Sequence, residues 1–200
     1  MKILIVGGTG EIGKAVAKEL AKRHTIIVAG HSRGDMKVDV LDRQSIEKMY
    51  HTVGKIDAVI STIGKVDIAP LTEMTHEKYA IGLNDKLMGQ VNLVLLGIPH
   101  VIDNGSFTLT SGILSNDPVA LGSSASMVNG ALDSFIKAAA IELPRGIRIN
   151  VVSPTLITES LSAFGPYFPG FESVPAARVA LAFSKSAEGH QTGQVYKVGY

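Results

Sequence analysis

The sequence predicts an α/β fold of three layers, in which a doubly wound and mostly parallel sheet of about seven strands is covered by helices on both faces. Three observations lead to this fold class. Short apolar runs rich in β-branched residues alternate with stretches of helical periodicity along the chain. A glycine-rich turn follows the first of these runs. No repeat, low-complexity segment or linker divides the 200 residues, so we expect one domain over residues 1–200.

The expected strands are short and largely apolar, as in a sheet that is buried on both faces. They cover residues 2–6, 25–30, 36–40, 56–62, 106–111, 147–153 and 193–198. The expected helices carry apolar residues on one face and charged residues on the other, as Ile12, Val16 and Leu20 do in the first. They cover residues 11–23, 43–53, 72–97, 120–143 and 174–186. Strands that alternate with helices imply parallel pairing through right-handed crossovers.

The composition excludes several function classes. The formal net charge is +1 and the Lys and Arg residues are scattered, so no basic stripe predicts a nucleic-acid partner. Gly7 and Gly8 end the first apolar run far short of a signal peptide or a membrane span. The chain has no cysteine, and its six histidines form no i, i+4 pair beside a carboxylate, so we expect no metal site. We therefore expect a cytoplasmic protein without a membrane partner.

The glycines of "VGGTGEIG" predict a dinucleotide-binding turn, because they follow a strand and open a helix. Gly7 permits the tight turn, Gly10 lets backbone approach a pyrophosphate, and Gly13 lets the helix lie close to the sheet. The helix N-terminus also presents free N–H groups to the phosphates. These features are typical of a Rossmann fold. The expected cofactor contacts here are Gly7, Thr9, Gly10, Glu11, Ile12 and Gly13.

The end of the second strand bears on the choice of cofactor. NAD-binding folds often place a carboxylate there that accepts hydrogen bonds from the adenosine ribose, and Gly30 stands at that place. His31, Ser32 and Arg33 follow and can donate to a 2′-phosphate, Arg33 in a bidentate fork. The pattern favours NADP(H) over NAD(H), although the nearby Asp35 leaves NAD(H) open.

Several further stretches resemble the short-chain dehydrogenase/reductase family, and together they span nearly the whole chain. "VDVLD" (38–42), "DAVISTIG" (57–64), "LTSGILS" (109–115), "IRINVVSPTLITESL" (147–161) and "TGQVYKVGY" (192–200) match its motifs in order and spacing. The resemblance implies an NAD(P)-dependent oxidoreductase acting on a small carbonyl or alcohol. It also implies further cofactor contacts from Asp39, Val40, Ser61, Thr62, Ile63, Pro154, Thr155 and Thr158, and a catalytic serine at Ser111.

The chain departs from the family where the proton chemistry is expected. Family members use a tyrosine to exchange the proton and a lysine, four residues later, that lowers its pKa and holds the nicotinamide ribose. Aligned on "NGALDSF", these places fall on Ala125 and Asn129. No tyrosine lies between Tyr79 and Tyr167, so shifting the alignment cannot recover one. Asn129 can still hydrogen-bond the ribose, but it carries no charge.

The family's active-site asparagine falls on Asn84 or, if Gly89 is the helix glycine three residues after it, on Lys86. We expect Lys86, which would return a cation to the site. Three hypotheses stay open. The first is a reductase in which Ser111 orients the substrate oxygen and water, Lys86 or Tyr167 supplies the proton. The second is a non-catalytic NADP(H)-binding sensor or regulator. The third, an epimerase or isomerase, is suggested only by the glycine spacing.

The apolar stretches "VNLVLLG" and "FIKAAAI" are longer than contact with one sheet requires. They lie in the expected helices around 84–98 and 120–143. Family members commonly pair these helices across a two-fold axis, and such pairing is the commonest closed assembly. We therefore expect a homodimer or homotetramer that binds a small-molecule substrate.

Overall fold

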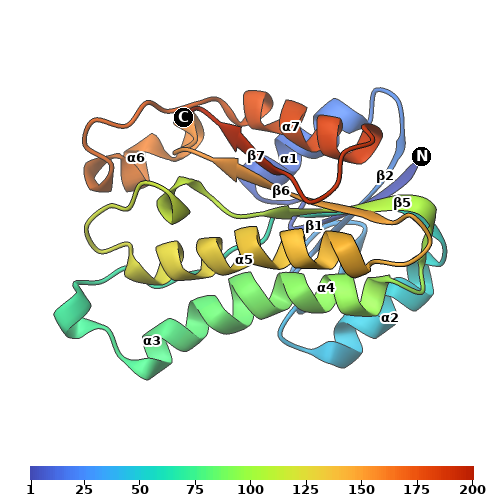
Figure 1. Cartoon of the computed structure of the whole chain (residues 1–200), viewed down its shortest axis with the longest axis horizontal. Helices are drawn as coiled ribbons and strands as arrows, with labels where there is room; N and C mark the ends of the chain where they lie inside the picture. The colour runs from blue at the N-terminus through green and yellow to red at the C-terminus, as the bar shows by residue number, and fades with distance from the viewer.

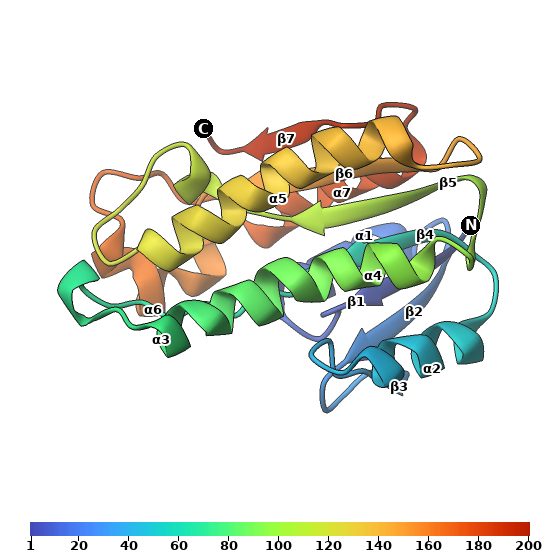
Figure 2. The same ribbon diagram turned by 60° about the horizontal axis from the view of Figure 1, so that its bottom comes forward.

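The computed structural model describes residues 1–200 as one sheet of seven parallel strands between two layers of helices (Figures 1 and 2). The strands are β1 (Lys2–Val6), β2 (Thr25–Gly30), β3 (Met36–Lys37), β4 (Ile56–Ser61), β5 (Val101–Thr110), β6 (Arg148–Pro154) and β7 (Val195–Val198). Their order across the sheet is β3-β2-β1-β4-β5-β6-β7, and all pairs are parallel. The predicted fold class is confirmed.

Two hydrophobic clusters, one on each face of the sheet, form the core. The helices are α1 (Glu11–Leu20), α2 (Arg43–Val53), α3 (His76–Ile81), α4 (Gly89–Gly97), α5 (Ser123–Glu142), α6 (Leu161–Phe164) and α7 (Ala176–Glu188). On one face, Tyr50, Leu93 and Leu132 bring α2, α4 and α5 against the strands. On the other face, Val16 and Phe183 do the same for α1 and α7. The regularly spaced apolar residues of these helices therefore face the sheet, as the sequence predicts.

The helical stretch expected at 72–97 consists of three consecutive helical segments. It begins at His76, because Thr75 caps α3 by accepting a hydrogen bond from Lys78 N at 3.4 Å. Residues Gly82–Met88 then form a π-helical segment, with Gly89 N bonded to Asn84 O, before α4 continues to Gly97. π-helical turns are rare and often occur at functional sites. This one carries Lys86.

Other expected boundaries also differ from the structure. The strand expected at 36–40 is only Met36–Lys37. Strand β5 begins at Val101, five residues earlier than expected, and an irregularity in its register with β4 accommodates the extra length. Helix α5 begins at Ser123 rather than at 120, because Leu121 has a φ of 67°, which lies outside the helical region.

The strand order reverses between β1 and β4, and this reversal positions the site. In doubly wound sheets, ligands bind beyond the carboxyl ends of the strands at such a point. Helix α6 and the N-terminal end of α5 lie at this end of the molecule, on the left in Figure 1. No helix of the chain is long and apolar enough to cross a membrane.

Candidate active site

The glycine-rich turn between β1 and α1 has the geometry of a phosphate cradle. Gly7 has a φ of +84°, which favours glycine. A Cβ on Gly13 would lie 2.3 Å from Gly7 O and 2.6 Å from Gly8 Cα, so only glycine lets α1 begin so close to the turn. A Cβ on Gly10 would meet only Gly7 O, at 3.4 Å. The backbone at Gly10, which precedes the helix, is therefore open to an approaching ligand.

Two adjoining cavities meet over the ends of β1 and β4. The first, which we call the polar cavity, has a volume of about 690 Å³ and includes Gly7, Gly10 and Asp39. The second, the apolar cavity, has a volume of about 300 Å³ and includes Ser111 and Asn129. Both are lined by Thr62, Ile63 and Gly64. Together they form an extended site of the kind that an adenosine half and a nicotinamide half would occupy.

The polar cavity collects most of the residues expected around the adenosine. They are Gly7, Thr9, Gly10, His31, Asp39, Val40, Thr62 and Ile63. The Asp39 carboxylate accepts a hydrogen bond from Leu41 N at 2.9 Å, which fixes the turn after Val38. Asn84, the alternative to Lys86 in the sequence, also lines this cavity. The structure thus separates the two candidates, since Lys86 lines the apolar cavity instead.

The turn after β2 presents its basic group to solvent. Ser32 and Arg33 are exposed and line neither cavity, and the Arg33 guanidinium has no hydrogen bond or ion pair within the chain. Asp35 turns its carboxylate back to β2, where it accepts from Val28 N at 2.8 Å. Gly30 is required here, because its Cβ would lie 2.5 Å from Arg33 O. A donor group is therefore free beside the polar cavity, while the nearest carboxylate is engaged.

Ser111 follows directly after β5 and lines the apolar cavity. Its backbone N–H donates to Val152 O at 3.0 Å, which anchors the residue to β6. The residue is 3% exposed and its hydroxyl has no hydrogen-bond partner within the chain. Buried hydroxyls are normally satisfied. Among the buried serines whose hydroxyl has no partner within the chain, Ser111 is the one that lines this cavity.

Lys86 reaches into the same cavity from the π-helical segment. Its Nζ donates to Ser111 O at 3.2 Å, and its stem runs past Gly64, where a Cβ would lie 3.2 Å from Lys86 Cδ. Burial lowers the pKa of Lys86 to about 8, while the carboxylates of Asp133 and Asp85 act in the opposite direction. A lysine with this pKa exchanges its proton near neutral pH, which suits acid–base chemistry.

Helix α5 presents three residues toward the same region at spacings of four. Ala125 and Asn129 line the apolar cavity, and Asp133 follows one turn later. Asn129 is 2% exposed; its Nδ2 donates to Gly112 O at 3.3 Å, and its Oδ1 has no partner. One oxygen of Asp133 accepts from Ser115 Oγ at 2.7 Å and the other has no partner. Two acceptor oxygens on this face of the helix, Asn129 Oδ1 and Asp133 Oδ1, thus have no partner within the chain.

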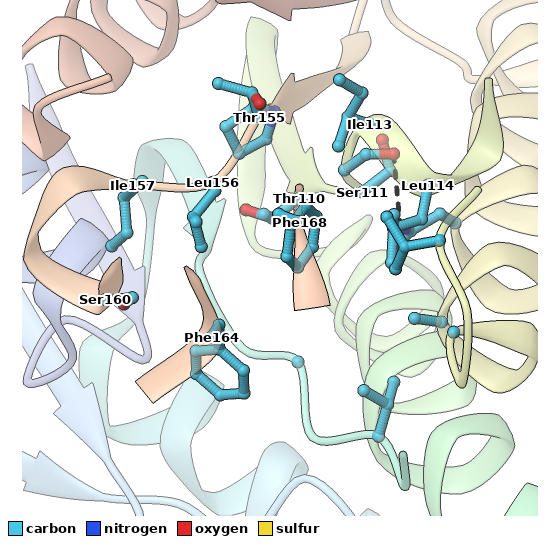
Figure 3. A pocket seen from close by; sticks show the side chains of 18 of the residues that line it. Thr110, Ser111, Ile113, Leu114, Thr155, Leu156, Ile157, Ser160, Phe164 and Phe168 are labelled. Atoms are coloured by element: carbon cyan, nitrogen blue, oxygen red, sulfur yellow. Dashed lines mark hydrogen bonds between the residues drawn. The ribbon is translucent and has the colours of Figure 1, made fainter. Parts of the chain in front are cut away.

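The outer walls of the apolar cavity are aliphatic and aromatic. In Figure 3, Leu156, Ile157 and Phe164 lie on the left of the cavity, and Ile113 and Leu114 lie on the right near Ser111. Phe168 and Tyr167 complete the lining from the segment after α6. Of all the lining residues, only Lys86 carries a charge.

The remaining expected contacts divide between the apolar cavity and other parts of the fold. Pro154, Thr155 and Ile12 do line the apolar cavity. Glu11 is exposed and pairs with Lys14 at 3.0 Å. Ser61 is fully buried and lines neither cavity, and its carbonyl accepts from Thr110 Oγ1 at 2.6 Å. Thr158 is exposed, with its hydroxyl 3.2 Å from that of Ser173.

Sequence reasoning missed Gln90 and Asp133. Gln90 is fully buried, and its amide bonds both to Lys86 O and to the backbone of Thr110. Asp133 influences Lys86 electrostatically. A signal for both was present, because each lies four residues after a candidate, Gln90 after Lys86 and Asp133 after Asn129, and so shares its helix face.

Comparisons with known proteins agree with this geometry. The family model described as Enoyl-(Acyl carrier protein) reductase matches residues 8–189. A solved small-chain dehydrogenase in complex with NADPH is 26% identical, with a TM-score of 0.88 over 99% of this chain and 96% of that one. The chain belongs to the short-chain dehydrogenase/reductase family. NAD(P)H binding is typical of that family, and the class of this chain, an NAD(P)-dependent oxidoreductase, follows from its membership.

Three relatives of this short-chain dehydrogenase/reductase differ in how similar they are to it. The solved protein lin1944 from Listeria innocua is 53% identical, with a TM-score of 0.98 and 99% of each chain covered. The uncharacterized oxidoreductase C922.06 of Schizosaccharomyces pombe is 32% identical over 176 residues, 78% of this chain and 66% of the relative. Human L-xylulose reductase is 25% identical over 80% of this chain and 73% of that protein.

Proposed function

We propose that the chain is a single-domain reductase that prefers NADPH and acts on a small carbonyl compound, with Ser111 orienting the substrate oxygen and Lys86 supplying the proton. One observation carries the proposal. Ser111, whose buried hydroxyl has no partner within the chain, lines the apolar cavity, and the Lys86 ammonium is bonded to the carbonyl of that same residue. A hydrogen-bond donor and a proton source thus converge where a substrate oxygen would lie.

Ala125 and Asn129 stand, on this proposal, where the family has its tyrosine and lysine. Both line the apolar cavity, which supports the alignment of "NGALDSF" made from the sequence. Ala125 offers no proton. The Asn129 amide oxygen is buried without a partner and would accept a hydrogen bond from a ribose hydroxyl. Lys86 then takes over the proton transfer from a different helix.

The cofactor would be held by groups along both cavities. The open backbone at Gly10 and the N-terminus of α1 suit the pyrophosphate, and Asp39 and Val40 suit the adenine. When bound, a reduced nicotinamide supplies a hydride. Arg33, Ser32 and His31 would donate to a 2′-phosphate, since Arg33 has no partner within the chain and Asp35 is engaged by β2. This arrangement supports NADP(H) over NAD(H).

The cofactor preference is tested by titration. We expect NADPH to bind more tightly than NADH, and Arg33→Ala to weaken NADPH binding about tenfold or more, because a hydrogen bond to a charged group is lost. NADH binding should change little. Arg43→Ala is the matched control, since Arg43 is an exposed arginine that pairs with Glu47 on α2. Equal binding of both cofactors would refute the preference.

The catalytic roles are tested by steady-state turnover on a panel of carbonyl compounds. We expect Lys86→Met and Ser111→Ala each to lower kcat by about 10²-fold or more, the range for an acid–base group or an oxyanion donor, without weakening NADPH binding. The controls are Lys48→Met on α2 and Ser134→Ala on α5, whose side chains are exposed. A wild-type rate in either site variant would show that the substituted residue has no catalytic role.

Ala125 and Asn129 also favour a second candidate, a non-catalytic NADP(H)-binding sensor or regulator. Neither an alanine nor a neutral amide can move a proton, so cofactor binding would survive while turnover is lost. Tight NADPH binding with no consumption by any carbonyl compound would select this candidate over the reductase.

We further propose a homodimer or homotetramer in which α4 and α5 pair with those of a second copy. The two helices lie side by side in both views (Figures 1 and 2), and Val94, Ile98, Phe135 and Leu143 border a shallow hollow between them. Leu95 is 56% exposed beside it. Light scattering should give a mass of two or four chains, and Leu95→Glu should lower it, whereas Leu181→Glu on α7 leaves a pair formed through α4 and α5 intact.

A further inference from the structure

Lys86 is the one amine among the residues that line the apolar cavity, and it forms no ion pair. The two carboxylates that act on it electrostatically are bonded elsewhere: Asp85 accepts from a backbone N–H at 2.8 Å, and Asp133 accepts from a serine hydroxyl at 2.7 Å. The Lys86 Nζ is bonded only to a neutral group, Ser111 O. Since a buried lysine is seldom left unpaired, this placement favours the uncharged amine.

The hydrogen bond of Lys86 is compatible with the loss of its proton. An amine keeps two N–H groups and gains a free lone pair, and the bond to Ser111 O uses only one N–H. The residue is half-buried, so a small molecule in the cavity can reach it. A lysine that is desolvated in a hydrophobic pocket is an activated nucleophile toward carbonyl carbons.

The walls of the apolar cavity select which carbonyl compounds reach this nitrogen. They include Ile113, Leu114, Leu156, Phe164 and Phe168. The volume of about 300 Å³ lies at the lower end of the range for ligand pockets, which suits a compound with a single ring. A carboxylate on such a compound would be desolvated here without an arginine or histidine to pair with it.

We propose that Lys86 is a covalent site for small, uncharged and apolar aldehydes, which its neutral amine captures as an imine in the apolar cavity. The inference goes beyond the proposed reductase, because imine formation uses no dinucleotide. The two roles of the residue are compatible. Below its pKa of about 8, Lys86 is an ammonium that can donate a proton, and above it an amine that can add to a carbonyl.

The reaction balances without an oxidant or a reductant. The Lys86 nitrogen forms a C–N bond to the aldehyde carbon, and the π electrons of the C=O bond move to the oxygen. That oxygen takes up one amine proton, which gives a carbinolamine. The nitrogen lone pair then forms the C=N bond, and the C–O bond breaks. The oxygen leaves as water with the second amine proton, and hydrolysis reverses the sequence.

A labelling experiment compares Lys86 with Lys48, an exposed lysine on α2. The reagents are benzaldehyde and sodium cyanoborohydride, which reduces the imine to a stable N-benzyl lysine. At pH 8 about half of Lys86 is amine, whereas an exposed lysine with a pKa of about 10.4 is almost wholly ammonium. We therefore expect Lys86 to be labelled about tenfold or more faster than Lys48. Mass spectrometry of the digested chain measures both sites.

A second aldehyde tests the selectivity of the cavity. The compound 4-formylbenzoate has the same ring as benzaldehyde and adds one carboxylate. Lys48, in solvent, reports the intrinsic reactivity of each aldehyde. Relative to Lys48, we expect 4-formylbenzoate to label Lys86 about tenfold or more slowly than benzaldehyde does, because its carboxylate must be desolvated.

A variant tests whether the aldehyde reaches Lys86 through the cavity. Ala125 lines the cavity, so Ala125→Leu adds bulk where the aldehyde must lie. In this variant we expect the labelling rate of Lys86 to fall toward that of Lys48. The matched control is Ala138→Leu, at an exposed position on the same helix, in which Lys86 should be labelled as in the wild type.

Three results would overturn the inference. They are labelling of Lys86 no faster than that of Lys48, equal labelling of Lys86 by the two aldehydes relative to Lys48, and labelling of Lys86 in Ala125→Leu as fast as in the wild type. Failure of the proposed function looks different. NADPH then does not bind or is not consumed, and the labelling rates, which are measured without NADPH, stay as expected.

Discussion

The Gln90 side chain exchanges two hydrogen bonds with the backbone of Thr110, donating to its carbonyl and accepting from its N–H, each at 2.9 Å. The same Nε2 also donates to Lys86 O at 2.9 Å. One buried amide therefore ties the segment that carries Lys86 to the strand end that carries Ser111. Gln90 thus links the two groups that we propose as proton source and substrate-orienting hydroxyl, although its amide bonds to neither the Lys86 ammonium nor the Ser111 hydroxyl.

Replacing Gln90 by leucine should cost both stability and activity. The change leaves Lys86 O and both backbone groups of Thr110 without that partner, so the free energy of unfolding should fall by about 3 kcal/mol. kcat should fall more than KM rises, because Lys86 loses its anchor. Urea unfolding and steady-state kinetics measure both effects. Gln44→Leu, at an exposed position on α2, is the control and should change neither.

Replacing Gly13 by alanine should weaken NADPH binding by about tenfold or more. The added Cβ would meet backbone atoms of Gly7 and Gly8, so the turn or the start of α1 must shift away from the geometry that cradles a pyrophosphate. Gly130→Ala on α5 is the matched control, because no atom lies within 4 Å of its new Cβ. It should bind NADPH normally and stabilise the helix by up to about 1 kcal/mol. Equal NADPH affinities of the two variants would contradict the prediction that this turn binds the pyrophosphate.

The pH dependence of reduction should follow Lys86. In the proposed reaction the proton donor is the ammonium form of Lys86, so activity should be full below its pKa and fall as the pH rises through about 8. A profile of kcat/KM against pH checks this. In Lys86→Met any residual rate should lose that descending limb, and a limb that persists would assign the proton to another group.

Asp133→Asn should shift that limb toward lower pH. The Asp133 carboxylate favours the charged form of Lys86, and without it the pKa of the lysine falls further below its ordinary value. At pH 8 the variant should therefore be slower than the wild type, with the difference vanishing in more acidic buffer. Asp117→Asn, an exposed carboxylate outside the cavity lining, provides the comparison. A limb at the same pH in both variants would exclude the electrostatic coupling.

Acid stability should depend on Glu188. Hydrogen bonds from Arg23, then from Ser184 and His24, lower the pKa of Glu188 to about 2, and those from Arg23 and His24 join α7 to the turn after α1. Because the pKa is lowered, the carboxylate stabilises the fold above pH about 4, the ordinary range of glutamate, and this contribution is lost as the pH falls toward 2. Glu188→Gln should cost at most about 1 kcal/mol at pH 7, since the network is partly exposed. Thermal unfolding at pH 7 and pH 3 compares it with Glu142→Gln.

The fold was predictable because its signals are local and repeated. Every strand and helix that covers the sheet appears in the sequence as an apolar run or an amphipathic stretch, and the turn at Gly7, Gly10 and Gly13 fixes where the site lies. The boundaries were harder, since Leu121 delays the start of α5 through its backbone conformation and β5 gains residues through an irregular register. Such adjustments depend on neighbouring segments rather than on the local pattern.

Site residues that directly follow a strand were easier to predict from the sequence than site residues on a helix. Ser111 follows from its place after β5, whereas Ser61, at the end of β4, is turned into the core. The orientation of Lys86 depends on the π-helical segment, which hydrophobic periodicity does not reveal. The link through Gln90 depends on two segments meeting in space.

That π-helical segment makes the position of the lysine depend on chain length as well as on residue identity. Gly89 N bonds to Asn84 O, five residues back, so the turn contains one residue more than an α-helical turn would. Deleting one residue between 82 and 88 would rotate the part of the helix before the deletion by about 100° relative to α4. Over evolution, one inserted or deleted codon could thus bring a cation into this cavity or withdraw it, while every residue of the cofactor cradle stays the same.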